Sequence, residues 1–136
     1  MKYKNILLLF FNIIIPLFCG LMIYVFMKSG TYINTFLNLD FQYKPTTVLE
    51  IFIINWFCDF LWSYALVFAL FLVLNPFKRR LIISALIPLA FGPTLEFLQK
   101  INVLSGTFDW WDIVIECFAV IIATLFIKKI SKKDGS

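Results

Sequence analysis

Four long apolar runs constrain this chain more than any other feature of its sequence. They cover residues 6–27, 51–74, 81–98 and 110–127. A helix needs about 20 mainly apolar residues to cross a bilayer core of roughly 30 Å. In lipid, only helices and closed barrels satisfy their own backbone polar groups. We therefore expect an all-α fold: one integral membrane domain, residues 1–136, built as a four-transmembrane-helix bundle surrounded by membrane lipids.

Composition removes several kinds of chemistry. Hydrophobic residues make up 62% of the chain and charged residues 15%, and there is no His. Without His, the chain has no Ser-His or Cys-His nucleophile pair and no His-ligated zinc. The three cysteines lie inside apolar runs without a CxxC spacing, which favours a structural role. No residue pattern identifies a nucleophile or a leaving group, so whether the protein is an enzyme stays open.

The basic residues predict the orientation of the helices. All of the twelve Lys and Arg residues except Lys28, Lys44 and Lys100 fall within residues 1–5, 75–80 and 128–133. Lys and Arg accumulate in cytoplasmic loops, so we expect both termini to be cytoplasmic. This topological role accounts for the positive charge without a nucleic-acid partner. Residues 130–136 have no predicted packing partner, and we expect a disordered tail there.

Residues 28–50 form the predicted outer connection between the first two helices. Their apolar side chains include Tyr32, Ile33, Phe36 and Leu37. This is more apolar than an ordinary loop, so the segment is expected to lie in the membrane interface or to cover a cavity as a lid.

The acidic residues are distributed in the opposite way, because only Asp134 of the eight falls on the cytoplasmic side. Asp59, Glu96 and Glu116 lie inside predicted spans, where an ionised group costs at least about 2.5 kcal/mol and is functional by default. Polar and small residues also recur every three or four positions, which places them on inward faces. The predicted faces are Asn12, Pro16, Cys19 and Gly20; Asn55, Asp59, Trp62 and Ser63; Ser84, Pro88, Gly92, Glu96 and Gln99; and Asp109, Asp112, Glu116, Ala119 and Ala123.

A simpler reading applies to part of this pattern. Asp109 could be the N-cap of the last helix, with Asp112 in its first turn and Trp110 and Trp111 as interfacial anchors. Pro88 and the Gly92-Pro93 pair predict a kink in the third helix.

Two motifs resemble the VanZ-like family of small bacterial membrane proteins. Glu96-Phe97-Leu98-Gln99 matches the family's Glu-x-x-Gln, and Asp109-Trp110-Trp111-Asp112 matches its Asp-x-x-Asp before a final helix with spaced small residues. The chain departs from the family where it lacks an Arg in the short loop. It also has Glu116 where Asn is frequent, and Ala119 and Ala123 where glycines are.

The resemblance implies a bacterial cytoplasmic (inner) membrane protein with a role in the cell envelope, because the family's namesake contributes to glycopeptide (teicoplanin) resistance. Together with the polar faces, it predicts an acidic, outward-facing intramembrane cavity. That cavity would bind a lipid-linked or glycopeptide-related ligand. The candidate ligand-binding residues are Asp59, Glu96, Gln99, Asp109, Asp112 and Glu116.

Two alternatives remain open at this point. The carboxylates could hold or transport a divalent cation, since oxygen ligands suit Mg²⁺, Ca²⁺ or Mn²⁺. The protein could instead be a structural or immunity protein of the membrane, with its acids paired to Lys44 or Lys100.

Overall fold

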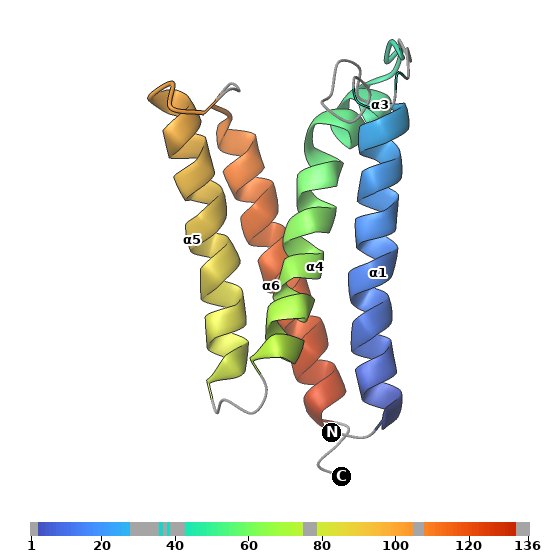
Figure 1. Cartoon of the computed structure of the whole chain (residues 1–136), viewed down its shortest axis with the longest axis vertical. Helices are drawn as coiled ribbons and strands as arrows, with labels where there is room; N and C mark the ends of the chain where they lie inside the picture. Colours follow the sequence, from blue (N-terminus) through green and yellow to red (C-terminus); the bar gives the residue numbers. More distant parts are fainter. Residues whose placement is uncertain are drawn as a thin grey trace.

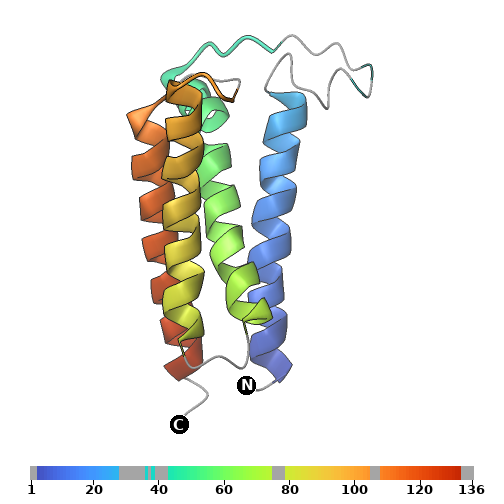
Figure 2. The same cartoon turned by 60° about the vertical axis from the view of Figure 1, so that its left-hand side comes forward.

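The chain folds into long helices that run alongside one another in the computed structural model, which describes residues 3–27, 36, 38, 43–74, 79–104 and 108–132. The helices are α1 (Tyr3–Phe26), α3 (Val48–Phe52), η1 (Ile53–Phe57), α4 (Cys58–Val73), α5 (Arg80–Lys100) and α6 (Trp110–Lys132). No strand occurs among these described residues, which confirms the all-α prediction. The first turn of α1 and the last turn of α6 lie at the same end of the molecule (Figures 1 and 2).

Three helical stretches in the described part of the chain are long and apolar enough to cross a membrane. They are Ile6–Phe26, Val48–Val73 and Arg80–Lys100. Large apolar side chains cover their outer surfaces: Phe18 is 60% exposed and Phe91 is 56% exposed. Such a surface suits lipid and not water, so the chain has the character of a membrane protein.

The middle of the chain forms one helix in three parts. Thr47 caps its start: the Glu50 amide donates to Thr47 Oγ1 at 3.3 Å, and the Thr47 amide donates to Glu50 Oε2 at 3.0 Å. This capping box starts the helix at Val48, before the predicted residue 51. A hydrogen bond to Glu50 also raises the pKa of the exposed Tyr43 hydroxyl. Within the helix, η1 is a π-helical turn, which inserts one extra residue into the helical repeat.

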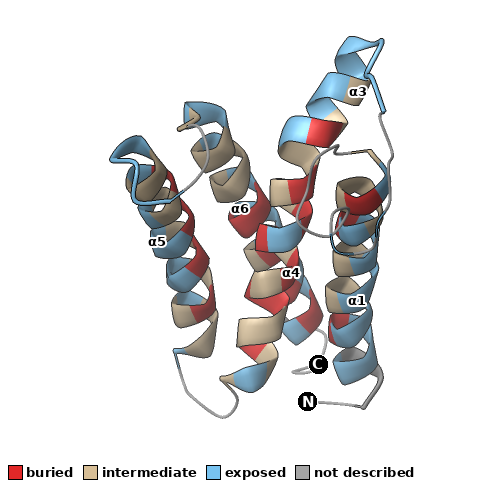
Figure 3. Cartoon of the chain, turned by 45° about the horizontal axis from the view of Figure 1, so that its top comes forward, coloured by how far each residue is buried: buried red, intermediate tan, exposed pale blue. Residues whose placement is uncertain are grey.

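The helix that contains α4 contacts α1, α5 and α6, and α5 packs on α6. A core cluster occupies the half of the bundle that contains the first turns of α1 and the last turns of α6. Figure 3 shows that the buried residues of the helices face the inside of the bundle. Its members are Leu9, Val67, Phe68, Phe71, Val120, Ala123, Ile127 and Ile130. Between α1 and α4, the Tyr64 hydroxyl donates to Asn12 Oδ1 at 2.7 Å.

Close approach of α1 to α4 depends on Gly20. A Cβ at this position would lie 3.2 Å from Trp62 Nε1, and Cys58 Sγ donates to the Gly20 carbonyl at 3.3 Å. The thiol therefore has a structural contact, in agreement with its predicted role.

The predicted inward faces are confirmed on α5 and α6. The buried residues of α5 are Ser84, Pro88, Gly92 and Glu96, each four apart. On α6, Ala119 and Ala123 have no exposed surface. Both prolines of α5 lie inside one continuous helix.

Predictions for the other two faces hold only in part. Ser63 and Gly20 are buried, whereas Asn55, Trp62 and Cys19 are exposed. The π-helical turn explains Asn55, because the extra residue rotates the positions before Cys58 relative to those after it.

The expected disordered tail is wrong for residues 130–132, because α6 continues to Lys132. Ile130 is only 6% exposed and belongs to the core cluster, so it has the packing partner that the sequence did not reveal. Residues 133–136 lie outside the described residues. So does most of the predicted lid, residues 28–50; of its first part the structure describes Phe36, which is 86% exposed, and Asn38.

Ile130→Ala should lower the free energy of unfolding by about 2 kcal/mol or more, because it leaves a cavity in the core cluster. Thermal unfolding of the purified protein in detergent measures this effect. Leu125→Ala, at a 59% exposed position of the same helix, is the control and should change stability little. Equal effects of the two variants would show that Ile130 does not stabilise the bundle.

Candidate functional site

Asp109 joins three helices at the end of the bundle opposite to the core cluster. Its Oδ1 accepts a hydrogen bond from the Trp111 amide at 2.9 Å, and its Oδ2 accepts one from Trp56 Nε1 at 3.2 Å. Its own amide donates to Glu96 Oε2 at 2.9 Å. Its Oδ1 therefore caps the start of α6, whereas its Oδ2 and its amide connect that start to η1 and α5.

Glu96 is held in this junction with only 8% of its surface exposed. A buried carboxylate needs hydrogen-bond donors, because its removal from water is otherwise very costly. The Asp109 amide is such a donor, since it lies ahead of the first turn of α6. The first residue of the Glu-x-x-Gln motif, Glu96, is thus in direct contact with the first residue of the Asp-x-x-Asp motif, Asp109.

Gln99 is not part of this junction. It is half-buried, and its backbone carbonyl accepts the Asn102 amide at 3.0 Å where α5 ends. Asn102 has a φ of 58°, the left-handed conformation that Asn tolerates after a helix.

Glu116 lies one to two turns into α6 and packs directly against Gly92 of α5. A Cβ on Gly92 would lie 2.9 Å from Glu116 Oε1, and still closer to Oε2 and Cδ. The carboxylate therefore occupies the space that any side chain at position 92 would need. Glu116 Oε2 is buried without a hydrogen-bond partner.

The charges of Asp59, Glu96 and Asp112 lie close enough to the Glu116 carboxylate to act on it electrostatically. We call Asp59, Glu96, Asp112 and Glu116 the acidic cluster. Side chains from α4, α5 and α6 contribute to it. Asp109 is linked to the cluster through its bond to Glu96.

The structure shows one contact of the two lysines that were predicted to pair with these acids. Lys100 Nζ lies 5.1 Å from the centre of the Phe108 ring, and a cation over an aromatic face is favourable. Pairing of an acid with Lys44 or Lys100 stays a prediction.

The geometry does not favour a bound metal ion. In the described ranges, no three or more Asp, Glu or Cys side chains are placed to hold one. The acids are spread over several helical turns, and one oxygen each of Glu96 and Glu116 faces protein groups.

Sequence reasoning missed Trp56, the residue that connects η1 to Asp109. Its ring centre also lies 6.5 Å from that of Trp111. A partly buried indole N–H usually finds an acceptor, and that rule was the available signal. The π-helical turn that sets the direction of Trp56 leaves no comparable mark in the sequence.

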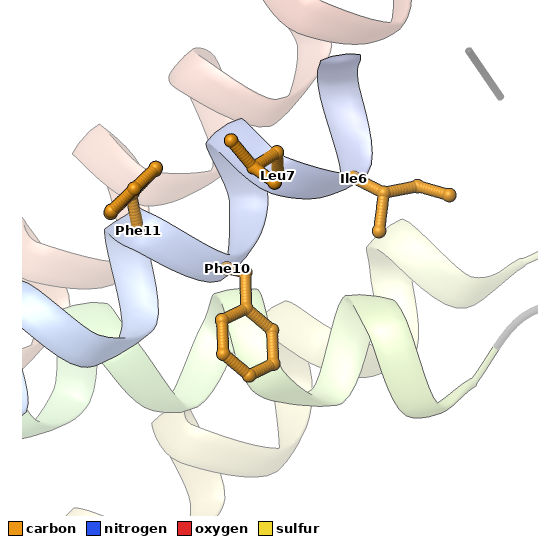
Figure 4. Close-up of a pocket in the computed structure, with 4 residues that line it drawn as sticks. All are labelled: Ile6, Leu7, Phe10 and Phe11. Carbon is orange, nitrogen blue, oxygen red and sulfur yellow. The ribbon is translucent and has the colours of Figure 1, made fainter. Parts of the chain in front are cut away.

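A separate shallow hollow lies on α1, among Ile6, Leu7, Phe10 and Phe11 (Figure 4). These four side chains are apolar and exposed, so the hollow resembles a lipid-facing surface and is distinct from the acidic cluster.

Comparisons with known proteins found no match: no family model, no curated protein and no solved structure is similar to this chain.

Trp56→Phe should destabilise the protein by about 1–3 kcal/mol, since it leaves Asp109 Oδ2 without its donor. Thermal unfolding in detergent measures the loss. Trp110→Phe is the matched control, because Trp110 is 67% exposed and makes a ring contact with Phe108 instead. A Trp56 variant as stable as the Trp110 variant would contradict the role of this bond.

Gly92→Ala should destabilise the protein by about 1–3 kcal/mol, because its methyl group displaces the Glu116 carboxylate. In a Glu116→Ala background the same change should be neutral, or stabilising by up to about 1 kcal/mol from helix propensity. Thermal unfolding of the four proteins forms a double-mutant cycle. If the effect of Gly92→Ala is the same in both backgrounds, the two residues are not in contact.

Proposed function

We propose that the chain crosses the membrane four times, with α6 as the fourth span and both termini in the cytoplasm. Support comes from the packing of α6 against α4 and α5, from the shared end of α1 and α6 (Figure 1), and from the basic residues at that end. In this arrangement the acidic cluster lies in the outer half of the membrane. The location that fits is a bacterial cytoplasmic membrane.

The protein is further proposed to be VanZ-like. The Glu-x-x-Gln motif at the end of α5 and the Asp-x-x-Asp motif at the start of α6 carry this proposal. Contact between Glu96 and the Asp109 amide supports it, since this bond joins the two motifs and so links the end of α5 to the start of α6. The absent Arg in the intervening loop argues against a strong phosphate site.

The function that this geometry supports best is the binding of a cell-envelope ligand, lipid-linked or glycopeptide-related, at the acidic cluster. The observation that carries it is the buried Glu116 Oε2, which has no hydrogen-bond donor and lies among three further acids. A ligand with hydroxyl or ammonium groups supplies the missing donor and reduces the repulsion. Such binding would contribute to envelope homeostasis or antibiotic resistance.

A structural or immunity role is the second candidate. It is favoured by the hydrogen bonds around Asp109, because the Glu96 and Asp109 carboxylates accept them from protein groups. Divalent cation binding ranks below both, because no three acidic side chains of the described residues are placed to hold one ion. The site offers binding groups and no nucleophile, so no reaction is proposed.

The test is thermal unfolding of the purified full chain in detergent, with an undecaprenyl-diphosphate-linked muropeptide, teicoplanin, Mg²⁺ or Ca²⁺ added separately. A ligand that binds only the folded state stabilises it by about 2.7 kcal/mol at 100 times its Kd. We expect the lipid-linked muropeptide or teicoplanin to raise the Tm of the parent. Glu116→Gln should abolish this rise. Glu50→Gln, which removes one charge outside the cluster, should preserve it.

Other outcomes decide against an envelope ligand at the cluster. No rise with any additive would leave the structural role as the better explanation. A rise with Mg²⁺ or Ca²⁺ alone, lost in Glu116→Gln, would make the cluster a cation site. A rise that both variants lose equally would indicate a general effect of charge and would remove Glu116 from the site.

A further inference from the structure

The end of the bundle opposite to the acidic cluster carries a second, separate concentration of charge. The described basic residues there are Arg79 and Arg80 at the start of α5 and Lys128 and Lys129 near the end of α6. The described acids lie towards the opposite end of the bundle. They are Glu50, Asp59, Glu96, Asp109, Asp112 and Glu116. The described residues of this end therefore carry positive charge and no acidic side chain.

The positive groups surround one well-packed apolar cluster. The guanidinium of Arg80 lies 4.2 Å from the centre of the Phe71 ring, and Phe71 is 3% exposed. Lys128 and Lys129 directly follow Ile127, and all three precede Ile130, which is also in the cluster. The core cluster therefore fixes both basic pairs relative to each other, although they are far apart in sequence.

Exposed apolar side chains lie on the three helices of this end. Ile82 of α5 is 58% exposed two residues after Arg80, Leu125 of α6 is 59% exposed one turn before Lys128, and Val73, near the end of α4, is 77% exposed. Small anions and nucleic acids have no acyl chain to pack against the apolar side chains of such a surface. A molecule with an anionic head and acyl chains matches both parts of it.

We propose that this basic end, defined by Arg79, Arg80, Lys128 and Lys129, binds anionic phospholipids. Their phosphate groups lie among the four cations, and their acyl chains lie along Val73, Ile82 and Leu125. The inference depends on the membrane location of the protein and is independent of any ligand at the acidic cluster. It assigns to these residues a binding role beyond the orientation of the helices.

The test uses the detergent-purified full chain, so that membrane insertion does not enter the result. Thermal unfolding is followed during titration with dioleoylphosphatidylglycerol, dioleoylphosphatidylcholine or inorganic phosphate. The test variant is Lys128→Gln/Lys129→Gln. The matched control is Lys44→Gln/Lys100→Gln, which removes two positive charges outside the basic end; Lys44 and Lys100 are exposed.

We expect the phosphatidylglycerol to stabilise the parent and the control pair, and to do so more than phosphatidylcholine. Each basic side chain contributes about fivefold to the attraction of an anionic lipid surface, so the Lys128/Lys129 pair should weaken the apparent affinity by about 30-fold. High salt should reduce the affinity of the parent more than that of the test variant.

Three results would overturn the proposal. Equal losses in the test and control pairs would show only an effect of net charge. Equal stabilisation by the two lipids would show that the headgroup charge is not recognised. Full stabilisation by inorganic phosphate would identify a small-anion site in place of a lipid site.

Discussion

The need to give each buried or partly buried carboxylate a hydrogen-bond donor organises the half of this molecule that holds the acidic cluster. Asp109 meets it with the Trp111 amide and the Trp56 indole, and Glu96 meets it with the Asp109 amide. In a membrane there is no water to replace these donors, so a shift of one helix would leave a charged group unsatisfied. Two of these bonds join elements at this end: the Trp56 indole links η1 to Asp109, and the Asp109 amide links the start of α6 to α5.

Glu116 is the exception to this rule, and for that reason it is the most informative acid of the cluster. Its carboxylate fills the space beside Gly92, and one oxygen has no donor. In the opposite half, Phe68, Val120 and Ile127 belong to the apolar core cluster, and the Thr124 hydroxyl of α6 is also buried without a partner among the described residues. The bundle thus combines an apolar half with basic groups at its end and a half that holds clustered acids.

Much of this arrangement could be predicted from the sequence, and the errors have physical causes. The four-residue spacing from Ser84 to Glu96 placed one face of α5 correctly, because residues four apart share a face on any helix. The exposure of Asn55 was missed, since a π-helical turn depends on contacts that periodicity does not contain. Ile130 was assigned to a disordered tail because its partners Leu9 and Phe71 are distant in sequence. Trp56 was missed for the same reason.

The sequence by itself determined the helical class, the apolar segments and the separation of acids from bases, because hydropathy and charge act locally along a helix. Only the tertiary structure decided which carboxylates are satisfied and which is left without a donor. Trp56 and Asp109 are 53 residues apart, and Glu96 and Asp109 are 13 apart. Contacts over such separations depend on how helices approach and rotate, and the spacing of residues within one helix does not specify that.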